Sequence, residues 1–424
     1  MLQVAYIRDN EDVVIRALNK RRFQDAENTI RKVLQLDESR KAAQQDLDGV
    51  LTELNSLSKQ IGGLMKQGDT AGAEQIKVKT AGLKEKSKEL TDARTTVEAE
   101  LQNLLYTIPN IPNGDVPDGV GEDDNEVVFE HGSTPDLPQG ALPHWELIRK
   151  YDIIDFELGV KITGAGFPVY KGKGARLQRA MVNLFLDEAL KMGYTEIQPP
   201  IVINEASGYG TGQLPDKDGQ MYHVTEEDFY LIPTAEVPIT NMYRDVILKE
   251  EDLPVKNVGY TPCFRREAGS WGAHVRGLNR LHQFDKVEIV QIQPPEKSYE
   301  ALKEMCRYVQ GLLEKLGLQY RVLNLCGGDL GFTAAQTFDM EVYSAAQKKW
   351  LEVSSVSNFE TYQANRLKLR YQTSDKKKQL LHTLNGSALA LPRIIAAVLE
   401  NNQTDNGIII PEVLVPYTGF DIIN

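Results

Sequence analysis

Four side chains of complementary chemistry lie close together in the middle of the chain. Arg265 and Glu267 are two residues apart, and Phe284 and Glu288 follow after a glycine-containing stretch. The apolar residues around both pairs predict a strand, a loop and a returning strand. Alternation along such a hairpin would place all four side chains on one face, where a cation, a ring and two carboxylates line one pocket.

Each of these side chains has a chemical use. A guanidinium offers forked donors to phosphate or carboxylate oxygens, a ring stacks on a base, and carboxylates accept from an amine or a hydroxyl. The set therefore suits a nucleotide bound together with an amine. A cross-strand salt bridge beside a core phenylalanine fits the same residues equally well.

Other common catalytic patterns are missing from the sequence. There is no P-loop, no Gly-x-Ser-x-Gly turn and no His-Glu-x-x-His, and the six histidines have no metal-binding spacing. Cys263, Cys306 and Cys326 are too few and too scattered for a disulfide framework or a zinc site. Hydrolases and zinc enzymes are therefore disfavoured, a reducing cytoplasm is expected, and Cys263 reads as a buried strand residue.

Length and charge set further limits. A chain of 424 residues suggests two domains, and 48 basic against 60 acidic residues argue against a protein that simply coats nucleic acid by bulk charge; no DNA partner is expected. The first residues lack a basic start followed by an apolar run, and no apolar run of about 18 residues occurs. Secretion and membrane insertion are disfavoured.

The residues before position 106 have helical spacing. Apolar residues recur at steps of three and four from Leu47 to Leu64, and every seven residues from Ile76 to Leu104. Two long helices are expected, the first from about Asn28 to Lys66, which would be roughly 60 Å long at 1.5 Å per residue. The glycines at 62, 63 and 68 are expected to form the turn, so residues 1–106 are predicted to be a projecting antiparallel arm.

The second helix of this arm carries a local excess of lysine. A phosphate backbone would suit this basic surface, but from the segment alone a solvated coiled-coil face without a ligand is the favoured interpretation. The residues concerned are Lys77, Lys79, Lys84, Lys86 and Lys88.

The arm is followed by an acidic stretch rich in proline and glycine. Residues 106–160 hold 12 acidic and 2 basic residues, a composition that predicts a solvated linker over 107–160. Repulsion of a polyanion is the less favoured alternative. The remaining chain mixes a helical stripe over 175–192 with short alternating runs such as 285–290 and 338–343, which predict strands with one polar face.

Several sequence blocks, taken in order, resemble class II aminoacyl-tRNA synthetases, and specifically the bacterial-type seryl-tRNA synthetases. Nearly the whole chain takes part, including the N-terminal hairpin, and several ordered blocks are far more specific than one. The blocks are Gly193–Pro200 (similar to motif 1), Gly210–Pro215, Ile232–Pro238, Phe264–Glu267 with His282–Glu288 (motif 2), Glu352–Phe359, Leu384–Ser387 and Ala390–Arg393 (motif 3).

This resemblance implies an α+β fold, with an antiparallel sheet flanked by helices and preceded by the coiled-coil arm. The catalytic domain would span 107–424, with the linker leading into it. The implied activity is that of a serine–tRNA ligase, which activates L-serine with ATP and transfers the seryl group to the 3′ end of tRNA(Ser). Whether tRNA(Sec) is also charged stays open. No protein nucleophile is needed, which agrees with the missing catalytic patterns.

The resemblance also assigns roles to individual residues. Arg265 would contact the α-phosphate of ATP and Arg393 its γ-phosphate, and these two are the implied catalytic residues. Glu267 would read the adenine amino group and Phe284 would stack on the ring. Glu352 and Ser355 would hold Mg²⁺, with no zinc involved. The implied ATP-binding set is Arg265, Arg266, Glu267, Phe284, Glu352, Val353, Ser354, Ser355 and Arg393.

A second implied set binds serine. Thr234 and Glu236 would hold the amino group, and Glu288, Asn385 and Ser387 would surround the hydroxyl. Such a pocket rejects alanine readily, since the missing hydroxyl leaves buried polar groups unpaired, whereas threonine must be excluded by steric closure. The full set is Thr234, Ala235, Glu236, Arg265, Glu288, Asn385 and Ser387.

The resemblance also implies partners. A homodimer would form through motif 1, and the arm would bind the elbow and variable arm of the tRNA, with its lysines as phosphate contacts. The sequence departs from common members at Arg266, at 271–275 and at 388–392, which leaves the motif 2 loop contacts uncertain. Two rivals, a ligase for carrier proteins and an inactive binding protein, are disfavoured by the arm and by the presence of Arg265, Glu267, Glu352 and Arg393.

Overall fold

A computed structural model describes residues 1–268 and 276–424 of the chain. The described residues form two compact units, one of Met1–Asn19 with Phe23–Pro109 and one of Lys20–Arg22 with Asn110–Asn424. No helix in these described ranges is both long enough and apolar enough to cross a bilayer. Cys263, Cys306 and Cys326 are all buried free thiols, as expected for Cys263.

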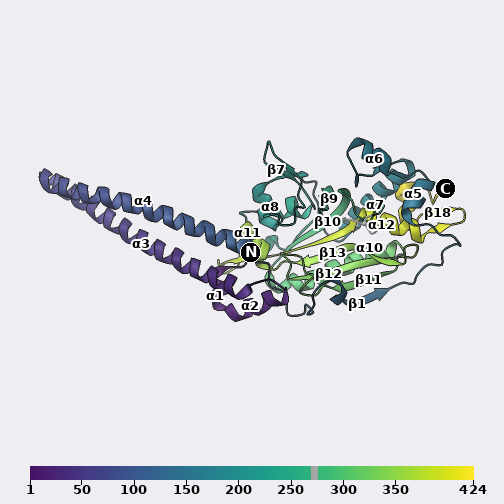
Figure 1. The fold of residues 1–424 in the computed structure, drawn as a ribbon, viewed down its shortest axis with the longest axis horizontal. Coiled ribbons are helices and arrows are strands. Elements are labelled where there is room, and N and C mark those ends of the chain that lie inside the picture. The colour runs from purple at the N-terminus through teal and green to yellow at the C-terminus, as the bar shows by residue number, and fades with distance from the viewer. Residues whose placement is uncertain (269–275) are drawn as a thin grey trace. The chain divides into compact units, whose positions relative to one another are not determined.

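The first unit is helical. Its two long helices lie side by side and antiparallel (Figure 1), as the leucine spacing predicts. The apolar positions Leu47, Val50 and Leu57 are buried along their contact. The helices of this unit are α1 (Val4–Asp9), α2 (Glu11–Lys20), α3 (Ala26–Lys66) and α4 (Thr70–Tyr106).

The turn between the long helices is shorter than the glycines suggest. Gly62 and Gly63 lie inside α3, so the expectation that they form the turn is wrong; the reversal occurs at Gln67–Asp69. Gly68 takes a φ of +82°, and the Asp69 carboxylate caps α4 by accepting from the Gly72 backbone N–H at 2.9 Å. Helical hydrogen bonding and packing outweigh the modest propensity cost of a glycine pair.

The second unit is built on one large sheet. All neighbouring strands are antiparallel except β4 and β9, which fits the α+β class expected. In spatial order the strands are β1 (Glu126–His131), β11 (Tyr320–Asn324), β12 (Gln336–Ser344), β13 (Lys349–Asn358), β16 (His382–Ala390), β10 (Gln283–Gln293), β9 (Val255–Phe264) and β4 (Thr195–Glu196).

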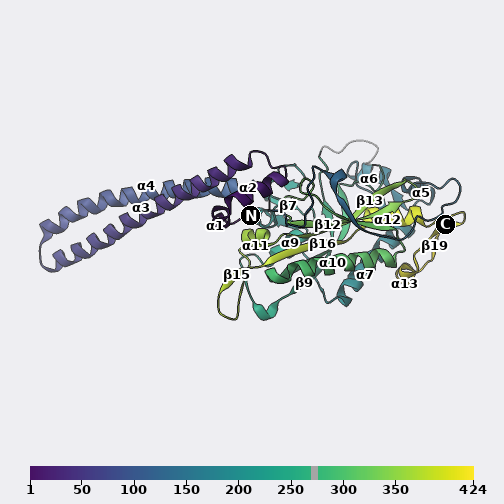
Figure 2. The ribbon, with the colours of Figure 1, turned by 90° about the horizontal axis from the view of Figure 1, so that it is seen from below.

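Helices cover one face of this sheet. Residues of α7, α10 and α12 join those of the central strands in a single apolar core, and α10 runs along the sheet in both views (Figures 1 and 2). The α-helices of the second unit are α5 (His144–Lys150), α6 (Phe156–Ile162), α7 (Gly172–Lys191), α8 (Glu205–Thr211), α9 (Glu236–Asn241), α10 (Ser298–Lys315), α11 (Thr361–Leu367), α12 (Leu391–Asn401) and α13 (Val415–Thr418).

Short strands form the remaining sheets at the edges of the unit. They are β2 (Ile154–Asp155) with β3 (Val169–Tyr170); β5 (Val202–Asn204), β7 (Phe229–Leu231) and β6 (His223–Val224); β15 (Lys378–Leu380), β14 (Arg370–Gln372) and β8 (Ile247–Lys249); and β17 (Gln403–Thr404), β18 (Gly407–Ile409) and β19 (Ile422–Ile423).

The acidic stretch is more ordered than a solvated linker. Its strand β1 pairs with β11, and the Asn110 side-chain amide donates to the carbonyls of Thr333 and Phe359 at 2.9 Å. Val116 and Leu147 are buried. Composition misleads here because a few apolar side chains and the backbone donors anchor the segment, while most of the carboxylates stay exposed.

Candidate active site

The central hairpin of the sheet is formed by β9 and β10, as predicted. Alternation along β10 sends Val287 and Ile289 into the core under the helices and presents Phe284, Lys286 and Glu288 on the opposite face. Cys263 on β9 lies directly across from Phe284. One face of this hairpin is therefore apolar, and the other carries the polar residues of the site.

Arg265 follows the end of β9 and reaches over the returning strand. Its backbone N–H donates to the His282 carbonyl at 2.9 Å, and its guanidinium lies 5.2 Å from the centre of the Phe284 ring. This cation–π contact brings together the cation and the ring that were predicted to line one pocket. The next residue, Arg266, donates its backbone N–H to the Gln220 carbonyl at 2.9 Å.

Glu267 reaches the site by a different route from the one predicted. Strand β9 ends at Phe264 and Glu267 has a φ of +48°, so strand alternation does not place it on the face of Arg265. The Glu267 carboxylate instead pairs with the Arg280 guanidinium at 2.6 Å. Strand pairing stops where the chain turns, and a left-handed residue redirects the side chain.

Glu288 is the centre of a buried polar group. Its Oε1 accepts from Asn385 Nδ2 at 3.0 Å, and Ser387 Oγ lies 3.4 Å from Oε2. Strand pairing explains this, because Glu288 lies opposite Ser387 in the register of β10 and β16. Lys286 Nζ adds a charged contact of 2.6 Å to Oε2. The three residues implied around a serine hydroxyl are thus in one place.

Glu236 brings a second buried carboxylate to this region. It lies at the start of α9, where its backbone N–H donates to Thr234 Oγ1 at 3.2 Å, and Ala235 between them is fully buried. Gln363 Nε2 donates to its Oε1 at 2.7 Å. Burial, and then the negative charge of Glu288, raise the pKa of Glu236 to about 7. A bound ammonium group would compensate that charge.

Glu352 and Ser355 share a face although they are three residues apart in one strand. The register of β12 and β13 shifts after Met340, which sets Glu352 opposite Glu341 and Ser355 opposite Asp339. An extra residue in a strand has this effect. Ser355 Oγ donates to the Asp339 carboxylate at 2.5 Å. Burial, together with the charge of Glu352, raises the pKa of Asp339 well above its usual range.

The side chains of Val353 and Ser354, between Glu352 and Ser355 on β13, do not point to the face that these two share. Val353 is buried in the core, and Ser354 Oγ donates to the Ser387 carbonyl at 2.6 Å, so their side chains hold the strand. Arg393 lies in the first turn of α12, and its Nη1 donates to the Glu352 backbone carbonyl at 2.7 Å. The same Nη1 lies 3.6 Å from the Glu352 carboxylate. Pro392 also lies in that first turn.

The oxygen donors on this face fit a hard divalent cation. In the ranges 1–268 and 276–424, no group of three or more His, Cys, Asp or Glu side chains is arranged to hold a metal. Glu352, Ser355 and Asp339 nevertheless offer two carboxylates and a hydroxyl, the ligand type that Mg²⁺ prefers. Burial, and then the charge of Glu352, raise the pKa of Asp339, and a cation there would offset the negative charge of both carboxylates.

The lysines of the arm lie on the exposed surface of α4. Lys77 and Lys79 are already paired, with Glu74 at 2.9 Å and Glu53 at 2.8 Å. Lys84, Lys86 and Lys88 are exposed, and no ion pair involving them occurs within the described residues. These three are the stronger candidates for phosphate contacts. The departure at 271–275, including Trp271, lies outside the described residues.

Three residues of the site were not predicted from the sequence. Lys286 was detectable, because it alternates with Phe284 and Glu288 on β10. Asp339 carried a weaker signal, since it belongs to an alternating strand but its partner Ser355 comes from another strand. Gln363 had none, because it hydrogen-bonds Glu236 over 127 residues of sequence.

Comparison with known proteins agrees with this geometry. The seryl-tRNA synthetase N-terminal domain matches residues 1–112, and the tRNA synthetase class II core domain (G, H, P, S and T) matches residues 222–402. The chain is 52% identical to the serine–tRNA ligase of Salinibacter ruber, covering 92% of this chain and 91% of the relative. It is 45% identical to that of Chlorobaculum parvum over the full length of both chains.

Solved structures give the same result. The crystal structure of seryl-tRNA synthetase from Pyrococcus horikoshii complexed with ATP has a TM-score of 0.92 and 32% identity, covering 100% of this chain and 99% of the other. The cytoplasmic serine–tRNA ligase from Naegleria fowleri in complex with AMP has a TM-score of 0.87 and 28% identity, with the same coverage. With both domains matched and full-length relatives above 30% identity, this chain belongs to the seryl-tRNA synthetases, the class II ligases for serine and tRNA.

Proposed function

We propose that this protein activates L-serine with ATP and esterifies tRNA(Ser) with it, and that the residues described above form the site of both steps. The observation that supports this most directly is the pair of buried carboxylates, Glu236 and Glu288, which lie near the Arg265 guanidinium that covers Phe284. One end of this group suits a small amino acid with a hydroxyl, and the other suits a nucleotide.

In the first step a serine carboxylate oxygen attacks the α-phosphorus of ATP. The bond from that phosphorus to the bridging oxygen of pyrophosphate breaks, which gives seryl-adenylate. Arg265 contacts the α-phosphate and stabilises the charge that develops on its oxygens. Phe284 stacks on the adenine, and Glu267, held by Arg280 at 2.6 Å, accepts from the adenine amino group.

The γ-phosphate end is assigned to Arg393 and to the oxygen donors of β13. Glu352 and Ser355 would hold Mg²⁺, with Asp339 beside them, and a bound Mg²⁺ would neutralise phosphate charge there. Val353 and Ser354 contribute to ATP binding by holding the strand that carries these donors. Arg266 completes the set at the end of β9.

Serine selection follows from the pairing of Glu288. Thr234, Ala235 and Glu236 receive the amino group, and Glu288, Asn385 and Ser387 receive the hydroxyl. Alanine would leave this buried carboxylate without the hydroxyl donor, a cost of about 1–3 kcal/mol for an unsatisfied buried group. Threonine adds one methyl, which must be excluded sterically.

In the second step the terminal ribose hydroxyl of the tRNA attacks the seryl carbonyl, loses its proton, and AMP leaves. The arm of residues 1–106 binds the tRNA through Lys77, Lys79, Lys84, Lys86 and Lys88, and the domain of 107–424 carries out the chemistry. We further propose a homodimer through the motif 1 region and a cytoplasmic location. The selenocysteine tRNA is a second acceptor to be tested alongside tRNA(Ser).

The test is ATP–pyrophosphate exchange with the purified full chain and serine, threonine, alanine or no amino acid, followed by charging of tRNA(Ser) and tRNA(Sec). We expect exchange with serine far above the other three. Arg265→Ala should abolish exchange while the protein stays folded. A folded wild-type protein with no serine-dependent exchange would refute the proposal and favour an arm-bearing binding protein.

A further inference from the structure

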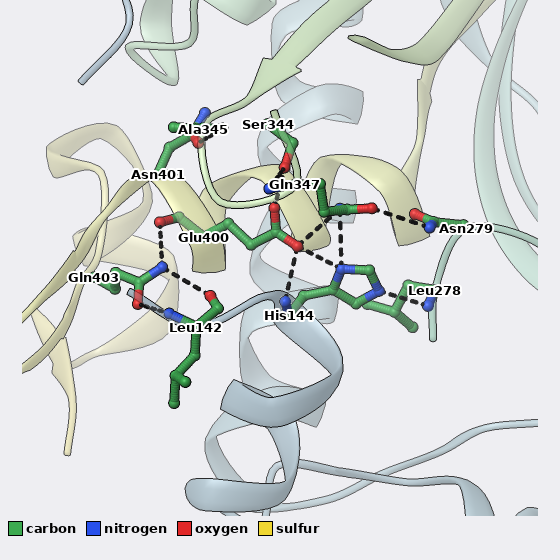
Figure 3. Close-up of polar contacts among 10 residues, drawn as sticks. All are labelled: Leu142, His144, Leu278, Asn279, Ser344, Ala345, Gln347, Glu400, Asn401 and Gln403. Carbon is green, nitrogen blue, oxygen red and sulfur yellow. Dashed lines mark hydrogen bonds and ion pairs between the residues drawn. The ribbon is translucent and has the colours of Figure 1, made fainter. Parts of the chain in front are cut away.

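Behind the ATP end of the site lies a fully buried histidine–glutamate hydrogen bond that no catalytic role accounts for. It joins His144, the first residue of α5, to Glu400 near the end of α12 (Figure 3). We infer that His144, held by Glu400, is a positioning residue that fixes the segment Arg276–Arg280 and, through it, Arg393 and Glu267. The inference rests on the proposed function of those two residues in ATP binding.

The contacts of His144 determine which ring nitrogen accepts and which donates. The Leu278 backbone N–H can only donate, and it lies 2.8 Å from His144 Nε2, so Nε2 accepts. The proton of the neutral ring is then on Nδ1, which donates to Glu400 Oε1 at 2.6 Å. The His144 backbone N–H donates to the same oxygen at 2.7 Å. The imidazole therefore connects a helix carboxylate to one particular backbone amide.

The Glu400 carboxylate also accepts hydrogen bonds from two other side chains. Ser344 Oγ donates to Oε2, and Gln347 Nε2 donates to Oε1 at 2.8 Å. Gln347 Oε1 in turn accepts from Asn279 Nδ2 at 3.2 Å, so the network reaches the same segment a second time (Figure 3). A buried carboxylate with this many donors is a fixed point from which the imidazole can be oriented.

Helix α12 holds the segment at two levels. Arg393 and Glu400 are seven residues apart, about two turns, and therefore lie on one face of the helix. Arg393 Nε donates to the Asn279 carbonyl at 3.0 Å, while Glu400 acts on the Leu278 amide through His144. One helix therefore fixes the backbone on both sides of the Leu278–Asn279 peptide bond, at the Leu278 N–H through His144 and at the Asn279 carbonyl through Arg393.

The segment has little freedom beside the imidazole. Gly277 has a φ of +68°, and a Cβ at that position would lie 2.3 Å from His144 Nε2. Arg280, two residues after Leu278, carries the guanidinium that pairs with Glu267. A shift of the Leu278 amide would therefore move the Asn279 carbonyl away from Arg393 and Arg280 away from Glu267. The ATP contacts proposed for Arg393 and Glu267 therefore depend on the position of this segment. The residues proposed to bind serine do not contact it.

Two substitutions separate the two hydrogen bonds of the imidazole, the one from Nδ1 to Glu400 and the one from Leu278 to Nε2. His144→Asn places an amide near Nδ1, so it keeps the donor to Glu400 and loses the acceptor for Leu278. His144→Gln extends to the position of Nε2, so it keeps an acceptor for Leu278. The two variants remove a similar amount of ring packing and each keeps one of the two bonds, so weaker ATP binding in His144→Asn alone reports the bond to Leu278.

We would measure the ATP dissociation constant by calorimetry, KM for ATP and for serine in pyrophosphate exchange, and deuterium exchange of the Leu278 amide. For His144→Asn we expect ATP binding to weaken about tenfold, the loss of one well-made hydrogen bond at about 1.4 kcal/mol per tenfold, with KM for serine unchanged and faster exchange at Leu278. For His144→Gln we expect ATP constants within about threefold of wild type and a slow Leu278 amide.

Asn401→Ala is the matched control, next to Glu400 in α12. The Asn401 side-chain amide bonds the backbone of Tyr343 and Ala345 and not the segment Arg276–Arg280. The substitution should therefore lower thermal stability without changing the ATP constants. If His144→Asn does not fold, Gln347→Met must weaken ATP binding selectively through Asn279. Equal ATP constants for the two His144 variants, or weakening in Asn401→Ala as large as in His144→Asn, would overturn the inference. Wild-type protein that lacks serine-dependent exchange would refute the proposed function, while the ATP dissociation constants would still decide this one.

Discussion

Lys286 Nζ lies 2.6 Å from Glu288 Oε2, and the two side chains are 7% and 1% exposed. A cation is therefore buried with the carboxylate assigned to the serine hydroxyl, two residues away on the same strand. Removing one member of such a pair leaves an uncompensated buried charge, which costs far more than the pair itself contributes.

From this pairing we predict that Lys286→Met destabilises the protein by about 3–5 kcal/mol and raises KM for serine. Unfolding should be followed by calorimetry together with serine-dependent exchange. The double variant Lys286→Met/Glu288→Gln should recover much of the lost stability and none of the activity with serine. Wild-type stability in the single variant would contradict the pairing.

The raised pKa of Glu236, about 7, predicts a pH dependence of serine binding. The positive amino group of serine needs the ionised carboxylate, so KM for serine should rise as the pH falls below about 7, by up to tenfold per unit at about 1.36 kcal/mol. Glu236→Gln should bind serine more weakly and lose this dependence. A KM for serine that is constant between pH 6 and 8 in the wild type would disprove it.

The Glu236 carboxyl also affects the stability of the fold. A rise in pH should strengthen serine binding but lower the contribution of Glu236 to stability. Its pKa in the folded protein is above the ordinary value of 4.5, so the folded state holds the proton more tightly than the unfolded one. Its contribution to the free energy of unfolding should therefore fall as the pH rises from about 4.5 to about 7. Comparing the pH–stability curves of wild type and Glu236→Gln would measure this, and parallel curves would exclude it.

The donors on β13 predict a magnesium phenotype. Glu352→Gln should raise the Mg²⁺ concentration for half-maximal exchange by about tenfold or more, as loss of a carboxylate ligand weakens a hard-cation site, and Ser355→Ala should raise it less. Arg393 bonds the Glu352 backbone carbonyl, so that contact survives both substitutions. Mn²⁺ binding, read by electron paramagnetic resonance, would give the same order. An unchanged Mg²⁺ requirement in Glu352→Gln would remove Glu352 from the ligand set.

The exposed lysines of α4 predict that tRNA binding and adenylate formation separate. Lys84→Glu with Lys86→Glu should weaken tRNA(Ser) binding and leave pyrophosphate exchange intact, with the salt dependence of binding reduced by about one unit of slope per lost phosphate contact. Lys376→Glu with Lys377→Glu makes the same charge change between β14 and β15 and serves as the control. Equal loss in binding and exchange would refute this division.

The sequence by itself determined the features that depend on local spacing or on short ordered blocks. Heptad spacing predicted α3 and α4, alternation predicted β10 and β12, and the ordered blocks indicated the family. Alternation also sufficed to bring Phe284 and Glu288 to one face of the hairpin, because both lie within one regular strand.

Only the tertiary structure decided the features that depend on register, on strand ends and on distant partners. The shift between β12 and β13 pairs Ser355 with Asp339, the end of β9 redirects Glu267 to Arg280, and β1 joins a sheet from an acidic stretch. The contact of Gln363 with Glu236 and that of His144 with Glu400 span 127 and 256 residues. Such pairs leave no periodic trace in a sequence, because the free energy that selects them comes from burying both partners together once the sheet has formed.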